Sequence, residues 1–217
     1  MKYSLNTIIL EPLSKIKPKN AVILCHGYGG DGKDISILAG YWKSYLPDTI
    51  FICPDAPEKC AASSVGFQWF DLMDQTPEQV LSKSLVAESK LNKLIDEVKD
   101  KNNLLANQIV IGGFSQGCMI SLQTGIKRKD TINSIIGYSG RIIDVDHLGK
   151  NIVSKPNIIL MHGELDQIVQ VDSLLEAKDF FIKNNYQVES HIFKNCEHRI
   201  PAEGSSLGLQ FIKKHLS

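Results

Sequence analysis

The chain has 217 residues, 43% of them hydrophobic and 22% charged, which is the size and composition of one folded domain with a substantial core. Lysine plus arginine and aspartate plus glutamate both number 24, so the formal net charge is zero. A neutral chain lacks the long-range field that attracts nucleic acid or an anionic membrane. We therefore expect a single domain over residues 1–217 that acts on a small molecule, binds no nucleic acid and does not insert stably into a membrane.

Cysteine usage and the N-terminal residues indicate the compartment. The cysteines are odd in number and widely spaced, and no C-x-x-C pair suggests a zinc or redox site. The first residues are too polar for the apolar region of a signal peptide, and no apolar run approaches membrane-spanning length. We expect a cytoplasmic protein with free thiols at Cys25, Cys53, Cys60, Cys118 and Cys196.

Short β-branched apolar runs alternate along the chain with longer segments of helical period. This alternation predicts an α/β fold with a mostly parallel central sheet and helices on both faces. Residues 54–67 and 140–156 are irregular and long enough to shape the rim of a pocket. The strands are expected at residues 6–10, 21–25, 49–53, 108–114, 134–138, 157–161 and 188–193, and the helices at 33–45, 77–101, 116–128, 172–184 and 203–215.

The first glycine-rich segment, residues 26–34, follows a predicted strand and precedes a helix. It satisfies G-x-G-x-x-G, with Asp55 at roughly the distance of a ribose contact, and also G-x-x-x-x-G-K, but Asp34 replaces the hydroxyl residue that would hold magnesium. Asp31 and Asp34 place negative charge where a phosphate would bind, which disfavours both nucleotide interpretations. We favour the third interpretation, a loop whose backbone N–H groups stabilise an oxyanion. The donors would be the amides of Tyr28 and Gln116.

The second glycine-rich segment is Gly113-Phe114-Ser115-Gln116-Gly117, which matches G-x-S-x-G between a predicted strand and a predicted helix. At such an elbow the serine backbone is strained, and small flanking residues let the strand and helix approach each other. A chance match in a turn is the alternative for so short a motif. The strand and helix on its two sides favour Ser115 as a catalytic nucleophile.

A serine nucleophile requires a base, and the base requires an acid that holds its tautomer. In chain order after the elbow, Asp166 follows the strand 157–161 and His198 follows the strand 188–193, so both fall on the sheet edge where Ser115 emerges. We predict Asp166 as the acid and His198 as the base. Glu164 and Asp172 are the alternative acids, whereas His147, His191 and His215 are interpreted as surface or core residues.

With these motifs in place, the chain resembles the phospholipase/carboxylesterase family of small α/β-hydrolases, which includes bacterial carboxylesterases and acyl-protein thioesterases. The resemblance runs from Val22 to the last helix. Tyr28 and Cys118 depart from the residues that many members carry at these positions. The motifs that carry it are residues 25–31, 54–57, 68–71, 113–117, 137–140, 162–166 and 197–198.

The resemblance implies an α/β-hydrolase fold and a triad of Ser115, Asp166 and His198, with an oxyanion hole at the amides of Tyr28 and Gln116. It also implies a serine carboxylesterase that needs no metal or organic cofactor. Acyl-protein thioesterase or lysophospholipase activity on the same triad is the alternative, and a non-catalytic binding module is the alternative of another class. A homodimer through exposed apolar rim residues stays open. The candidate substrate-binding residues are Trp69, Phe70, Met73, Met119 and Ile168, with a core position as an equal alternative for Trp69.

Overall fold

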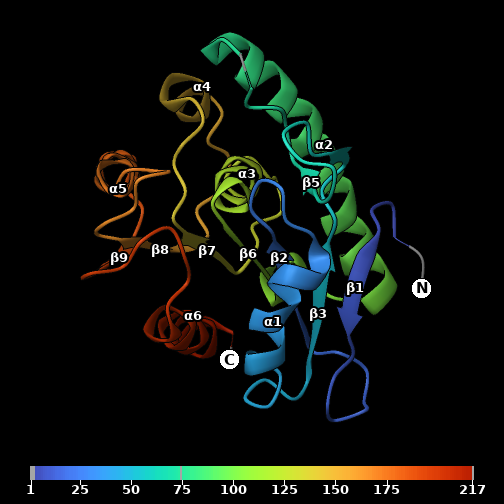
Figure 1. Ribbon diagram of the computed structural model, residues 1–217. Helices are drawn as coiled ribbons and strands as arrows, with labels where there is room; N and C mark the ends of the chain where they lie inside the picture. Colours follow the sequence, from blue (N-terminus) through green and yellow to red (C-terminus); the bar gives the residue numbers. More distant parts are fainter. Residues whose placement is uncertain (1–2, 74, 217) are drawn as a thin grey trace.

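The central feature of the computed structural model, which describes residues 3–73 and 75–216, is a seven-stranded sheet (Figure 1). The strand order is β1-β3-β2-β6-β7-β8-β9, and every neighbouring pair is parallel except β1 with β3. This confirms the predicted α/β class with a mostly parallel sheet. The strands are β1 (Thr7–Leu10), β2 (Asn20–Cys25), β3 (Thr49–Pro54), β6 (Ile109–Phe114), β7 (Ser134–Tyr138), β8 (Asn157–Gly163) and β9 (Val188–Phe193).

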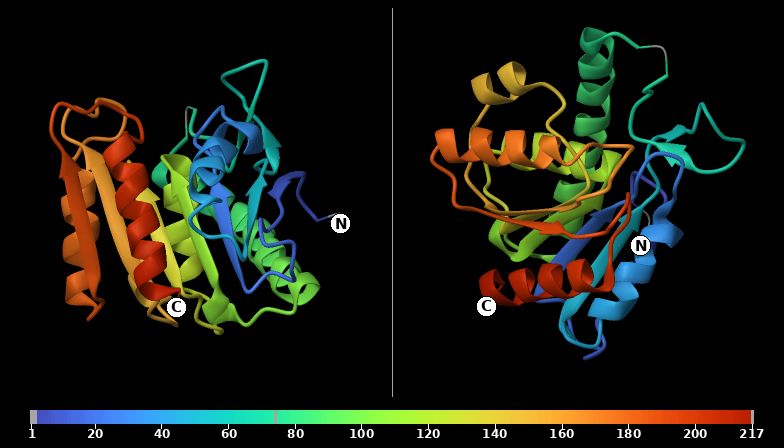
Figure 2. Two further views of the ribbon diagram at one scale, coloured as in Figure 1. Left: turned by 90° about the horizontal axis from the view of Figure 1, so that it is seen from below. Right: turned by 60° about the vertical axis from the view of Figure 1, so that its left-hand side comes forward.

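Helices cover both faces of the sheet. Figure 2 shows α1 and α6 on one face and the other helices on the opposite face. Each layer encloses its own apolar cluster, one under α1 and α6 and a larger one under α2, α3, α4 and α5. The inner strands are almost completely buried, as strands covered on both faces should be. The helices are α1 (Gly32–Trp42), α2 (Pro77–Asn102), α3 (Gln116–Gly125), α4 (Val145–Lys150), α5 (Asp172–Lys183) and α6 (Ala202–His215).

Local sequence signals account for most element boundaries. Thr76 and Gln79 form the capping box at the start of α2, with Pro77 in its first turn. The two irregular segments do contain regular structure that the sequence analysis did not predict. Residues 140–156 include α4, which Asp144 caps, and residues 54–67 overlap the two-stranded ribbon of β4 (Glu58–Lys59) and β5 (Phe67–Gln68).

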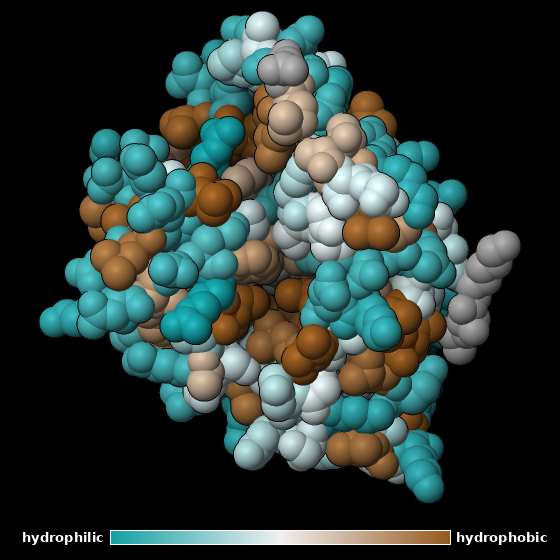
Figure 3. All heavy atoms as spheres, in the orientation of Figure 1, coloured by the Kyte–Doolittle hydropathy of each residue, from teal (hydrophilic) through white to brown (hydrophobic). Residues whose placement is uncertain are grey.

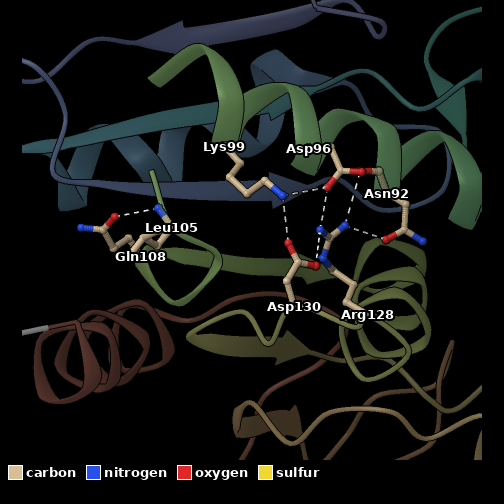
Figure 4. Close-up of polar contacts among 7 residues, drawn as sticks. All are labelled: Asn92, Asp96, Lys99, Leu105, Gln108, Arg128 and Asp130. Carbon is tan, nitrogen blue, oxygen red and sulfur yellow. Dashed lines mark hydrogen bonds and ion pairs between the residues drawn. The ribbon is translucent and has the colours of Figure 1, made fainter. Parts of the chain in front are cut away.

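A polar cluster joins α2 to the segment after α3 (Figure 4). The Arg128 guanidinium donates to Asn92 Oδ1 at 2.9 Å, to Asp96 at 2.6 Å and to Asp130 at 2.7 Å. Lys99 adds a contact of 3.0 Å to Asp130. This cluster ties two helices that pack side by side on the same face of the sheet.

Parallel strands bring distant parts of the chain to one edge of the sheet. Cys25 pairs with Gly113 at the ends of β2 and β6, and Gly163 pairs with Phe193 at the ends of β8 and β9. The loops that follow these four strands carry the glycine-rich segment, the elbow, Asp166 and His198. The topology therefore places all the predicted catalytic segments at the carboxyl edge, where ligands bind in open α/β sheets.

Candidate active site

Ser115 lies on a strained turn between β6 and α3. Its φ of 54° and ψ of −117° belong to a region that non-glycine residues rarely adopt, and its N–H donates to the Tyr138 carbonyl at 2.8 Å. A Cβ at Gly117 would collide with the Cys25 carbonyl, and one at Gly113 would collide with the Gly117 backbone. These close contacts explain both glycines and confirm the predicted strand-to-helix elbow.

The first glycine-rich loop lies against this elbow. A Cβ at Gly27 would stand 3.3 Å from the Ser115 Cβ, so the two segments are in direct contact. Neither the Tyr28 N–H nor the Gln116 N–H donates to an acceptor in the part of the chain that the structure describes. Gln116 is the first residue of α3, where the field of the helix also favours negative charge. Two free amides beside one hydroxyl are what an oxyanion site requires.

Two buried side chains hold the glycine-rich loop in place. The His26 ring donates from Nδ1 to the Gly27 carbonyl at 2.7 Å and accepts from the Ala56 N–H at Nε2, at 2.9 Å. Burial lowers the pKa of His26, which keeps the ring neutral in this arrangement. The Trp69 indole donates to the His26 carbonyl at 3.0 Å. The loop is therefore fixed before any ligand binds.

The same geometry accounts for the residues that imitate phosphate-binding loops. Asp55, the candidate ribose contact, accepts from the Gly32 N–H at 2.9 Å and from the Asn6 amide at 2.6 Å. Asp31 caps α1 by accepting from the Asp34 N–H at 2.8 Å. The N–H groups at the start of α1 that would bind a phosphate therefore already donate to carboxylates of the protein.

Asp166 and His198 come together as predicted. His198 Nδ1 donates to Asp166 Oδ2 at 2.7 Å, while Asp166 Oδ1 accepts from the Ile168 and Val169 amides at 3.0 and 2.9 Å. Burial by itself would raise the pKa of the Asp166 carboxyl, but these hydrogen bonds outweigh it and the pKa lies below its usual value. The carboxylate stays ionised and fixes the tautomer of His198, leaving Nε2 free to accept a proton.

Two observations place this imidazole beside the elbow. The ring centroids of His198 and Phe114 are 4.7 Å apart, and Phe114 directly precedes Ser115. A cavity of about 360 Å³ opens between the glycine-rich loop and the segment after β9. No hydrogen bond joins the Ser115 hydroxyl to His198 within residues 3–73 and 75–216. The residues lining the cavity are His26, Gly27, Tyr28, Gly30, Asp34, Ile35, Phe114, His198, Arg199 and Ile200.

His162 is a further residue of this site that the sequence analysis did not assign. It is buried at the end of β8, and its Nε2 donates to the Val169 carbonyl at 2.7 Å and lies 3.3 Å from Asp166 Oδ2. Burial lowers the pKa of His162, so the ring is a neutral donor. The His162 ring therefore closes the turn of residues 163–169 around the Asp166 carboxylate. In the sequence, this role was indicated only by its position four residues before Asp166.

The candidate substrate-binding residues fall into two groups. Trp69 and Phe70 are fully buried, and Gln116 holds this segment because its side chain accepts from the Trp69 N–H at 2.8 Å and donates to the Phe70 carbonyl at 2.6 Å. Met119 is also buried. Met73 and Ile168 are exposed, at 50% and 74% of their surface. The structure therefore buries Trp69, Phe70 and Met119 and exposes Met73 and Ile168, and all five stay predictions as pocket walls.

The alternative acids and the remaining histidines have other partners. Glu164 accepts from the Asn195 N–H at 3.3 Å, and Asp172 is the first residue of α5. His191 lies 3.3 Å from Glu203, and His147 lies 3.3 Å from Lys127. His215 packs on Phe211 at the end of α6. None of these five lines the cavity beside Phe114 and His198.

Comparison with known proteins shows the family to which the chain belongs. Residues 9–217 match the family model described as Phospholipase/Carboxylesterase. Acyl-protein thioesterase 1 of Saccharomyces cerevisiae is 30% identical over 227 residues, covering 96% of this chain and 98% of that protein. The protein of the same name from Yarrowia lipolytica is 30% identical over 212 residues, covering 90% of this chain and 91% of its own.

Solved structures agree as well. The crystal structure of esterase PE8 superposes with a TM-score of 0.93 at 31% identity, covering 98% of this chain and 99% of that one. The Bacillus cereus carboxylesterase shares the fold, with a TM-score of 0.79 at 16% identity over 98% of this chain and 95% of its own.

No helix in the described residues is both long and apolar enough to cross a membrane. The chain belongs to the phospholipase/carboxylesterase family, a family of serine hydrolases with the α/β-hydrolase fold.

Proposed function

We propose that this protein is a serine carboxylesterase that hydrolyses carboxylic esters through an acyl-enzyme on Ser115. The observation that carries the proposal is the 2.7 Å hydrogen bond from His198 Nδ1 to the buried Asp166, on the sheet edge that also carries the strained Ser115. This bond leaves His198 Nε2 as the free base beside Phe114 and the elbow.

The reaction begins when His198 Nε2 removes the proton of the Ser115 hydroxyl and the oxygen attacks the ester carbonyl. The contact between hydroxyl and imidazole forms with the bound substrate, since such catalytic hydrogen bonds often tighten only in the complex. The protonated His198 gives its proton to the leaving oxygen, which departs as an alcohol. Water then attacks the acyl-enzyme by the same proton transfers, and the acid is released.

The carbonyl oxygen becomes an anion in each tetrahedral intermediate. The free amides of Tyr28 and Gln116 supply its two hydrogen bonds in this proposal, because both lie beside Ser115 and neither has an acceptor among the described residues. One such donor is worth about 3 kcal/mol in the barrier. His26, Trp69 and the Gln116 side chain keep these amides in position before the substrate arrives.

Thioester hydrolysis on the same residues is the second candidate. The acyl-protein thioesterases of Saccharomyces cerevisiae and Yarrowia lipolytica, which are similar to this chain, favour thioesters, whereas the similarity to esterase PE8 favours esters. Lysophospholipid hydrolysis would use the same chemistry. A non-catalytic binding module is disfavoured, because it would not need the strained Ser115 and the ordered acid and base together. The buried free thiols support our proposal of a cytoplasmic setting.

Turnover of matched p-nitrophenyl esters and acyl thioesters by wild type and Ser115→Ala tests the proposal. We expect wild type to hydrolyse at least one series and Ser115→Ala to lose about 10⁴-fold or more in kcat. Ser139→Ala is the matched control, because Ser139 also has a positive φ, of 49°, and directly follows β7, the strand next to β6. A folded wild type that turns over neither series would favour the binding module.

A further inference from the structure

A second hollow lies on the outer surface, between α1 and α6. Its volume is about 1060 Å³, larger than that of the cavity beside His198. Its walls combine apolar side chains with hydroxyl and amide groups. The residues that line it are Asp34, Ile35, Ile37, Leu38, Gly40, Tyr41, Trp42, Ser44, Tyr45, Ile200, Pro201, Ala202, Ser205, Ser206, Leu209, Gln210 and Lys213. We call it the α1–α6 groove.

One wall of the α1–α6 groove is an exposed apolar stripe. Ile37, Tyr41 and Tyr45 follow one another at intervals of four residues, so they lie on one side of α1 and its C-terminal extension. They expose 62%, 67% and 61% of their surface. Figure 3 shows hydrophobic residues gathered over the region of α1, on the face where α6 lies beside it. An exposed apolar stripe of this kind marks a binding surface.

The α1–α6 groove leads to the proposed catalytic site. Asp34, Ile35 and Ile200 line both the groove and the cavity beside His198, so the two hollows meet at the N-terminal end of α1. From Ile37 to Tyr45 the stripe then extends for about 12 Å, at 1.5 Å per helical residue. A flexible chain that starts at the imidazole can therefore continue along α1.

We propose that the α1–α6 groove holds the leaving group of the substrate, and that this leaving group is an extended apolar chain on the departing oxygen or sulfur. The proposal rests on the proposed function, because it uses the direction of proton transfer. His198 must deliver its proton to the leaving atom, so the leaving group lies on the imidazole side of the site. The cavity on that side is the one that joins the groove, whereas Met73, Met119 and Ile168 line neither hollow.

Two ester series of equal total length separate the two sides of the scissile bond. One series keeps a short acyl group and lengthens the alcohol, and the other keeps a short alcohol and lengthens the acyl group. We expect kcat/KM to rise about two-fold for each added methylene of the alcohol, the value for a methylene half-buried in an open groove. A rise confined to the acyl series would overturn the proposal.

Charge placed on the stripe tests the same surface directly. We expect Tyr41→Asp and Ile37→Asp to lower the ratio of kcat/KM for long over short alcohols about ten-fold. Ile182→Asp is the matched control, because Ile182 is 52% exposed on α5 at the opposite face of the sheet and should leave this ratio unchanged. An unchanged ratio in both stripe variants, with thermal unfolding like that of wild type, would contradict the proposal.

The remaining outcomes separate this proposal from others. If the stripe is a contact between two copies of the chain, light scattering will show a wild-type dimer that Tyr41→Asp splits without changing the ratio, and the leaving-group proposal is then wrong. If Ser115→Ala keeps its turnover, the proposed nucleophile is wrong, independently of the groove. Both proposals are supported if Tyr41→Asp and Ile37→Asp lose the preference for long alcohols and Ser115→Ala loses turnover.

Discussion

Two polar clusters occupy the two ends of α3, and they differ in whether the groups left without a protein partner face a cavity. Beyond the C-terminal end, Arg128 donates to three side chains, and Lys99 forms ion pairs with two of them, Asp96 and Asp130 (Figure 4). Among the described residues, the buried Nε of Arg128 has no partner. At the N-terminal end, the Asp166 carboxylate accepts three hydrogen bonds, but within residues 3–73 and 75–216 His198 Nε2 and the amides of Tyr28 and Gln116 have no partner, and His198 lines the cavity.

The difference teaches how to separate a structural cluster from a chemical one. Charged groups whose partners are all protein atoms hold elements together and have no reason to bind anything else. Groups that are rigidly held on one side and open on the other are prepared for a ligand or a transition state. The first cluster should therefore matter for stability and the second for rate.

The largest expected effect is a fall in kcat when the Asp166–His198 cluster is changed. Asp166→Asn should lower kcat about 10⁴-fold, because an amide in place of the carboxylate stabilises the wrong tautomer of His198. Glu164→Gln is the matched control, since Glu164 lies two residues away and is exposed, and it should keep its rate. Steady-state kinetics of both variants measure kcat. A fall in kcat of less than ten-fold in Asp166→Asn would show that Asp166 is not the acid that orients His198.

The same experiment at the other end of α3 should affect stability instead. Arg128→Met removes hydrogen bonds to Asn92, Asp96 and Asp130, and we expect the free energy of unfolding to fall by about 2–3 kcal/mol. Urea denaturation measures the loss, and kcat should stay at the wild-type value. A large fall in kcat at conditions where the variant is fully folded would break the distinction between the two clusters.

His162 sharpens the comparison because it contacts both Val169 and Asp166. His162→Leu should lower kcat about ten-fold with little change in KM, since the turn around the carboxylate loses a buried donor. His162→Gln, which keeps an N–H at a similar reach, should restore most of the rate. In an Asp166→Ala background His162→Leu should have almost no further effect on kcat, whereas a purely structural role would lower the rate equally in both backgrounds.

The smallest effect is a dependence of stability on pH. His26 and His162 have folded pKa values below their usual value, because both are buried. In the unfolded chain a histidine has a pKa of about 6.5, so the unfolded state binds more protons below that pH. Stability is thus complete above about pH 6.5 and falls as pH decreases, by at most about 1.4 kcal/mol per pH unit for each ring. Urea denaturation from pH 7 to 5 should show a smaller slope for His162→Gln than for wild type.

Most of the sheet and the positions of the candidate catalytic residues could be predicted from the sequence. Predicted and observed strands differ by at most two residues at any end, because near-continuous apolar runs between turn residues have few alternatives in an α/β fold. The elbow was predictable from Gly113 and Gly117, since both glycines meet backbone atoms that leave no space for a Cβ. Asp166 and His198 followed from their positions after two parallel strands.

The supporting contacts were not predictable, because they depend on side chains that meet only in the fold. Trp69 was open as a pocket wall or a core residue, and only the structure shows its indole on the carbonyl of His26, 43 residues away. Gln116 was assigned for its main-chain amide, and its side chain adds a link to Trp69 and Phe70. No period or spacing in the sequence encodes such pairs.

The most direct test of the account is covalent labelling with a serine-directed phosphonate, read by intact-mass and peptide mass spectrometry. We predict that one label attaches to wild type at Ser115 and that Ser115→Ala, folded to the same extent, takes none. Undiminished labelling of Ser115→Ala, or a label on another residue of wild type, would contradict the proposed nucleophile.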